Sequence, residues 1–148
     1  MNRLFKNSFF ASLLLVFSVI TSISSCTTVA ATVSEQNKAQ VEQNRVQGLP
    51  LWASCNFKSE EASAYIPGYK TNEKGLFASG TGTSATSARV TARANLAYYC
   101  KTTYKYTNSA SSETLLGSRI IDSFTASDGT VYVLMFISEK DAKKSFGG

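Results

Sequence analysis

Cysteine carries most of the chemistry available to this chain, because the sequence has 3 cysteines and no histidine. Without an imidazole, neither a Ser-His-Asp triad nor a Cys-His pair can form, and a zinc site has no histidine ligand. Cys26 ends the stretch Ile23-Ser24-Ser25-Cys26, an aliphatic residue followed by two small residues and a thiol. In this pattern, the bacterial lipobox, the small residues fit a peptidase cleft and the thiol accepts a diacylglyceryl group. The spacing therefore predicts lipidation at Cys26.

The residues before the lipobox have the order of an export signal. Arg3 and Lys6 form a short basic region, Phe9–Ile20 is mainly apolar, and small or hydroxylated residues follow. The apolar run is short for a membrane span, so we interpret residues 1–25 as a lipoprotein signal peptide rather than a permanent anchor helix. The next residue after the cysteine is Thr27, not the Asp that marks inner-membrane retention. We expect the outer membrane as the destination, or the plasma membrane if the source has a single membrane.

Cys55 and Cys100 remain once Cys26 is acylated. An exported protein folds in an oxidising compartment, so this even pair predicts a disulfide bridge. Two other interpretations stay open. One is a pair of buried free thiols, and the other is a redox-active pair, for which the spacing is unlike Cys-x-x-Cys.

A glycine-rich segment, Gly80-Thr81-Gly82-Thr83-Ser84-Ala85, follows an expected strand and opens an expected helix. Phosphates bind helix amino termini in such a context. However, no acid occurs between Glu73 and Glu113, so the ribose-binding carboxylate of a dinucleotide site is missing. We interpret the segment as a tight strand-to-helix corner capped by Ser84, and we predict no cofactor.

Basic residues recur along the same expected helix. Arg89 and Arg93 lie one turn apart, and Lys101 and Lys105 repeat that spacing. Such a row suits an anionic surface such as lipopolysaccharide or nucleic acid, although it is also the ordinary solvated face of a helix. The net charge of +5 falls to +3 without residues 1–25, which is too low to predict nucleic-acid binding. Aromatic residues able to stack a ligand are also present, although core and rim positions are favoured for most of them: Trp52, Tyr98, Tyr99, Tyr104, Tyr106 and Tyr132. Asp122 and Asp128 flank a strand-turn region, and their spacing indicates no paired-carboxylate site.

The helix and strands expected from the sequence would position these residues. Their order predicts an α+β domain, with one long helix packed against a mostly antiparallel sheet. Residues 75–80 form the first expected strand, and residues 114–126 and 130–138 form two more, joined at Asp128-Gly129. The expected order is strand-helix-strand-strand. The helix runs from Ser84 to about Tyr106, and its inner face is expected to carry Ala85, Ala88, Ala92, Leu96, Tyr99 and Thr103.

We expect three regions along the chain: the signal peptide (1–25), a lipidated tether (26–47) and the α+β domain (48–148). The tether has no aromatic residue, and its apolar residues make no convincing stripe. A solvated tether is therefore favoured over a helix through Glu35–Gln47 that ends at Gly48. Residues 59–75 are expected to form a surface loop with a turn at Pro67-Gly68.

Several stretches together resemble the LPP-twenty lipoprotein domain family of exported bacterial proteins. The resemblance implies a long helix cradled by a curved antiparallel sheet. It also implies a surface or outer-membrane lipoprotein without enzymatic activity, in some members associated with flagellar or motility assemblies. The cysteine pair and the short end after Ser138 depart from the family pattern. The matching stretches cover about residues 50–138 and are, with the lipobox, Pro50-Leu51-Trp52, Leu76–Gly82, Ala88–Ala97 and Asp128–Leu134.

The expected function is that of a non-enzymatic, lipid-anchored envelope lipoprotein with a structural, assembly or protein-interaction role, in a motility-associated or other outer-membrane complex. An exposed strand edge would mediate self-assembly or bind a protein partner. The alternative is a small-molecule or glycan-binding periplasmic module that uses the Gly80–Ser84 corner and nearby aromatic residues. A hydrolase would need rarer chemistry, such as a Ser-Lys pair. No metal site and no nucleic-acid partner are expected.

Overall fold

The computed structural model describes residues 28–108 and 115–147. Two compact units divide the chain, residues 1–33 and residues 34–148. Helix α1 (Thr28–Gln47) begins in the first unit and ends in the second. Every contact described below lies within the second unit.

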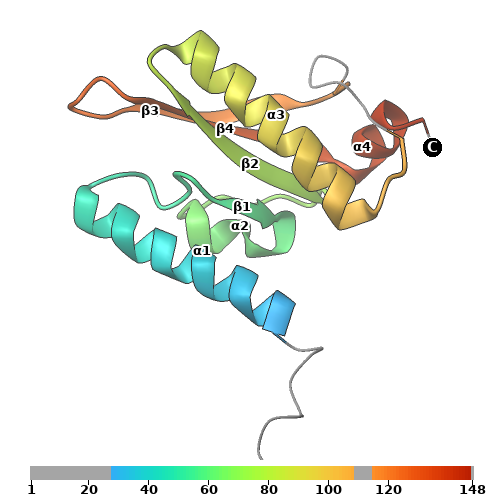
Figure 1. Ribbon diagram of the computed structural model, residues 1–148, viewed down its shortest axis with the longest axis horizontal. Helices are drawn as coiled ribbons and strands as arrows, with labels where there is room; N and C mark the ends of the chain where they lie inside the picture. Colours follow the sequence, from blue (N-terminus) through green and yellow to red (C-terminus); the bar gives the residue numbers. More distant parts are fainter. Residues whose placement is uncertain (1–27, 109–114, 148) are drawn as a thin grey trace, which may run out of the picture. The chain divides into compact units, whose positions relative to one another are not determined.

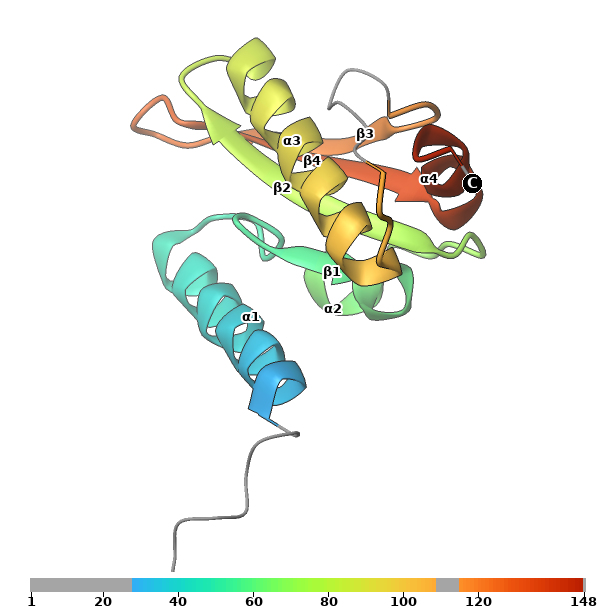
Figure 2. The ribbon, with the colours of Figure 1, turned by 45° about the vertical axis from the view of Figure 1, so that its right-hand side comes forward.

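A four-stranded antiparallel sheet forms the centre of the second unit, with the strand order β1-β2-β4-β3. Helix α3 (Ala85–Tyr104) lies across one face of this sheet (Figures 1 and 2). The expected α+β class and the order strand-helix-strand-strand, here β2-α3-β3-β4, are confirmed. The strands are β1 (Asn56–Lys58), β2 (Gly75–Gly82), β3 (Arg119–Thr125) and β4 (Val131–Ser138).

Side chains of the two central strands alternate between two hydrophobic cores, one on each face of the sheet. We call them the helix core, which packs against α3, and the aromatic core on the opposite face. Both faces are covered, so residues 133–138 of β4 are all buried. From the strands, the helix core receives Leu76, Ala78, Val133, Met135 and Ile137, and the aromatic core receives Phe57, Phe77, Leu134 and Phe136.

Helix α3 begins at the predicted cap. Ser84 accepts a hydrogen bond from the Ser87 N–H through its Oγ, and its own N–H donates to the Ser87 Oγ. The buried stripe is narrower than predicted, since Ala85 is exposed and the last buried residue is Cys100 rather than Tyr99 or Thr103. The other buried residues of α3 are Ala88, Ala92 and Leu96.

The prediction of a solvated tether is wrong for residues 28–47, which form α1. Asn44 is fully buried, and its Nδ2 donates to the carbonyls of Ala53 at 2.6 Å and Leu51 at 3.2 Å. Val41 packs against the aromatic core. The less favoured interpretation, a helix through Glu35–Gln47 that ends at Gly48, is therefore correct at its carboxyl end, whereas the helix begins earlier, at Thr28. The buried carboxamide of Asn44 attaches the carboxyl half of α1 to the fold, and a search for an apolar stripe does not detect a contact of this kind.

The carboxyl end of α1 has the features that the helical interpretation required. Gly48 adopts a φ of +68°, a left-handed conformation that glycine accepts without strain. Arg45 and Glu42 form an ion pair at 2.9 Å. Because residues 34–47 belong to the second unit, that unit starts before the expected boundary at residue 48.

Shorter elements complete the fold. Residues 59–65, expected as loop, form the 3-10 helix η1 (Ser59–Glu61) and the short helix α2 (Ala62–Tyr65). The predicted turn at Pro67-Gly68 is present, with a hydrogen bond from the Tyr69 N–H to the Ile66 carbonyl. The β3–β4 turn at Asp128-Gly129 is also present, and α4 (Glu139–Ser145) follows β4.

Candidate functional site

The predicted lipidation residue, Cys26, lies outside the described residues, and so do the lipobox and the apolar run before it. Acylation and export therefore stay predictions. Within the described residues, no helix is both long and apolar enough to cross a bilayer.

Cys55 and Cys100 are unbonded in the structure, in contrast to the predicted disulfide. Cys55 belongs to the aromatic core and Cys100 to the helix core, so the sheet separates the two thiols. Burial raises the pKa of the Cys55 thiol to about 11 and that of Cys100 to about 12. Both thiols are thus held neutral, as expected of core residues rather than of reactive ones.

Packing explains the glycines at the strand-to-helix corner. A Cβ at Gly80 would overlap the backbone of Ala92, and a Cβ at Gly82 would overlap Ser87 and Ala88. The alanine-rich inner face of α3 therefore approaches the β2 backbone closely. These glycines do not need a phosphate to account for them.

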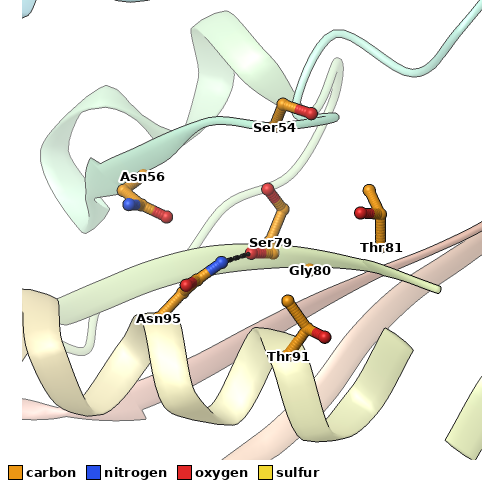
Figure 3. Close-up of a pocket in the computed structure, with 7 residues that line it drawn as sticks. All are labelled: Ser54, Asn56, Ser79, Gly80, Thr81, Thr91 and Asn95. Atoms are coloured by element: carbon orange, nitrogen blue, oxygen red, sulfur yellow. Dashed lines mark hydrogen bonds between the residues drawn. The ribbon is translucent and has the colours of Figure 1, made fainter. Parts of the chain in front are cut away.

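Beside this corner lies a small polar cavity, which we call the polar notch (Figure 3). It forms because β1 begins only at Asn56, opposite Ala78, whereas β2 continues beyond that pair to Gly82. The Ser79 N–H still donates to the Cys55 carbonyl at 3.3 Å. The Ser79 carbonyl instead accepts from the Asn95 Nδ2 at 2.8 Å, so a side chain of α3 takes the place of a strand. The notch has a volume of about 170 Å³ and is lined by Ser54, Asn56, Ser79, Gly80, Thr81, Thr91 and Asn95.

Every side chain that lines the polar notch is a hydroxyl or a carboxamide, apart from Gly80. These groups can both donate and accept hydrogen bonds, but none of them titrates near neutral pH. This volume has room for several water molecules. The notch can therefore hold a small neutral polar molecule, and its own residues supply no general acid or base.

The sequence indicated only part of the notch. Gly80 and Thr81 belong to the predicted corner, whereas Ser54, Asn56 and Asn95 were not singled out. The aromatic residues expected beside a ligand do not line the notch. Ser54 has a φ of +59°, an uncommon conformation for a residue other than glycine, and a single sequence gives no signal for it.

The predicted aromatic candidates lie in several places. Trp52 is buried in the aromatic core, where its Nε1 donates to the Oδ2 of Asp122 at 3.1 Å. Burial raises the pKa of Tyr99 and also that of Tyr104. Asp128 lies in the β3–β4 turn, where the Thr130 N–H donates to its Oδ1 and lowers its pKa. The structure thus gives these residues mainly core and turn positions.

One tyrosine differs from the others. Tyr98 is 71% exposed, and it lies on the side of α3 away from the sheet, together with the exposed Val90 (59%) and Ala94. We call these three residues the outer face of α3. Of the basic residues predicted from the sequence, Lys101 and Lys105 follow Tyr98 on the same side of the helix and are exposed, and Arg93 is half-buried on the flank of this face. Arg89 is exposed, but it lies on the opposite side of the helix from Tyr98.

A second cavity, of about 230 Å³, lies at the other end of β2. Its lining includes Lys58, Lys74, Glu60 and Glu139, so both signs of charge are present. Among the residues that the structure describes, no cluster of His, Cys, Asp or Glu is suited to hold a metal ion.

No family model matches the chain, and neither does a curated protein or a solved structure.

Proposed function

We propose that this chain is a non-enzymatic, lipid-anchored lipoprotein of the bacterial envelope, whose folded unit acts by binding. The observation that carries the proposal is Ile23-Ser24-Ser25-Cys26, placed directly after a basic region and an apolar run. The Cys26 thiol loses its proton, and its sulfur displaces the phosphorylated headgroup of a phospholipid to form a thioether to the diacylglyceryl group. Hydrolysis of the peptide bond before Cys26 then frees an amine for a third acyl chain. Two or three acyl chains hold a protein firmly at a bilayer, whereas one holds it only marginally.

The sheet edges bear on how the folded unit would bind a partner. β1 has only 3 residues, and β3, the other edge, is interrupted by a bulge between Ile120 and Asp122. Successive residues of an edge strand direct their backbone groups alternately toward and away from the neighbouring strand, and the Ser123 N–H points away from β4. This N–H donates to the Asp122 Oδ1 at 2.8 Å. Bulges and occupied backbone groups discourage strand addition at an edge. We therefore place the binding surface on the outer face of α3 rather than on a strand edge.

Cell fractionation of the wild-type chain and of a Cys26→Ser variant tests the anchor. The wild-type protein should sediment with envelope membranes and partition into detergent. The variant keeps the small side chain but loses the acylated sulfur, so it should accumulate as an uncleaved precursor. Equal maturation and equal detergent partitioning of both proteins would overturn the proposal.

The polar notch favours a second candidate function, the binding of a small neutral polyhydroxyl ligand such as a sugar residue. This function depends on the hydroxyl and carboxamide lining and needs no aromatic platform. NMR titration with neutral monosaccharides should shift the Asn56 and Thr81 amides in the wild-type chain and not in an Asn56→Ala variant. An exposed Ser63→Ala variant should behave like the wild type. If no shifts occur at high saccharide concentration, the notch is only a hydrated gap.

A further inference from the structure

The outer face of α3 is apolar and exposed, although a helix surface that only contacts water is usually polar. Val90, Ala94 and Tyr98 follow one another at four-residue spacing, so they line one side of a helix of 20 residues. Val90 is 59% exposed and Tyr98 is 71% exposed. The buried stripe from Ala88 to Cys100 already supplies the contact with the sheet. The exposed apolar side chains are therefore free to meet something outside the fold.

The charge on this helix has a single sign. Arg89, Arg93 and Lys101 lie in α3, and Lys105 is its carboxyl-terminal cap. The helix contains no acid, and neither do the residues on either side of it between Glu73 and Glu113. Lys101 and Lys105 lie on the same side of the helix as the outer face. This side is therefore complementary to a surface that combines apolar material with anions.

We propose that the outer face of α3 lies on an anionic lipid surface, with Tyr98 and Val90 among the headgroups and the neighbouring cations against lipid phosphates. This inference rests on the proposed function, because the Cys26 anchor is what brings the folded unit to a bilayer. Tyrosine suits the boundary between headgroups and acyl chains, since its ring is apolar and its hydroxyl is polar. The occupant is thus the lipid surface itself.

An acidic protein is the other class of occupant, and the structure favours it less. A protein interface of ordinary size buries a larger patch with aromatic anchors at its centre. The outer face of α3 has three apolar residues and one aromatic ring. A shallow, weak contact of this kind becomes effective only when another attachment already holds the unit at the surface.

The experiment uses the acylated full chain reconstituted into two kinds of vesicle, phosphatidylcholine alone and phosphatidylcholine mixed with phosphatidylglycerol. A Val90→Cys variant carries an environment-sensitive fluorophore. Cys55 and Cys100 are buried and neutral, so the new thiol is the one labelled. A label at Ser63→Cys, an exposed position on α2, is the control.

The label at position 90 should shift to shorter wavelength in the anionic vesicles only, and the shift should disappear at about 1 M salt, where charges are screened within roughly 3 Å. The label at position 63 should not respond. Adding Lys105→Asn should reduce the lipid contact about fivefold. Removing an exposed cation elsewhere, by Lys70→Gln, should leave the contact unchanged.

Identical spectra for the label at position 90 in neutral and anionic vesicles would overturn the lipid contact while leaving the anchor in place. Shielding of this position by an acidic envelope protein, and not by anionic vesicles, would overturn it in favour of a protein partner. Failure of neutral vesicles to retain the acylated chain would overturn the anchor and, with it, this inference.

Discussion

The indole Nε1 of Trp52 donates a hydrogen bond to the Oδ2 of Asp122 at 3.1 Å, and the two residues are 70 positions apart in the chain. The other oxygen of the same carboxylate accepts from the Ser123 N–H at 2.8 Å. Trp52 is buried, whereas Asp122 is exposed on the edge strand β3. A single carboxylate therefore ties the segment before β1 to the opposite edge of the sheet, and it also occupies a backbone donor at that edge.

Replacing this carboxylate should weaken the fold. Asp122→Ala leaves the buried indole N–H without its acceptor, and we expect the free energy of unfolding to fall by about 1–3 kcal/mol. Asp122→Asn keeps an oxygen acceptor and should lose less. Urea titration can follow both variants by fluorescence, because the chain has 1 tryptophan. An Asp122→Ala midpoint equal to that of the wild type would contradict the role of this contact.

Asn44 should be essential for docking the end of α1. Asn44→Leu leaves the carbonyls of Ala53 and Leu51 without the donor that they share, so we expect a loss of about 1–3 kcal/mol in the free energy of unfolding. Amide hydrogen exchange in residues 37–47 should become faster. Gln43→Ala, at an exposed neighbouring position, is the matched control and should change little. The interpretation fails if the two variants unfold alike.

The close approach of α3 to β2 predicts that Gly80 does not tolerate a methyl group. The Cβ of Gly80→Ala would overlap the Ala92 backbone, which cannot move like a flexible side chain. We expect a destabilisation of about 3 kcal/mol or more, measured by thermal unfolding. The exposed neighbour Thr83→Ala should stay within about 0.5 kcal/mol of the wild type. A stable Gly80→Ala protein would show that the helix does not pack as described.

The buried thiols predict that the fold loses stability at alkaline pH. In the unfolded chain a thiol loses its proton near pH 9.0, whereas the folded chain holds it to about pH 11 at Cys55 and about pH 12 at Cys100. Between these pH values the unfolded state binds fewer protons than the folded state. The contribution of the thiols to the free energy of unfolding is therefore fully present below pH 9 and decreases as the pH rises above it. Urea titrations across this range should show the fall, and Cys100→Ala should make it less steep.

The thiol contribution to this alkaline effect requires Cys55 and Cys100 to be free, and the raised pKa values of Tyr99 and Tyr104 add to the effect. Denatured, unreduced mature protein should therefore release two reactive thiols per chain from Cys55 and Cys100. A value of zero would restore the disulfide predicted from the sequence, and it would contradict the separation of the two residues by the sheet.

The sequence predicted those parts of the fold that local chemistry controls. Ser84 caps α3 and Asp128-Gly129 turns the hairpin, because hydroxyl caps and a left-handed glycine act over only a few residues. The four buried residues of α3 fall at helical spacing, although the stripe ends at Cys100 rather than at the expected Tyr99 and Thr103.

Long-range polar contacts are what the sequence did not reveal. Asn44 docks α1 through carbonyls up to 9 residues away, and Asn95 serves β2 across 16 residues. The sequence does not distinguish an asparagine that makes such a contact from one whose side chain is only solvated. The polar notch was only partly indicated, because it depends on where β1 begins beside β2. The disulfide prediction depended on an oxidising compartment and on an even pair of cysteines. It did not take into account which face of the sheet each thiol occupies.

Mass spectrometry of the amino-terminal peptide, taken from the organism that encodes the chain, tests the central claim most directly. The account predicts a peptide that begins at Cys26 and carries the mass of a diacylglyceryl thioether, with or without an additional acyl chain on the amine. A chain that still begins at Met1, with an unmodified Cys26 thiol, would contradict the lipid anchor and everything proposed from it.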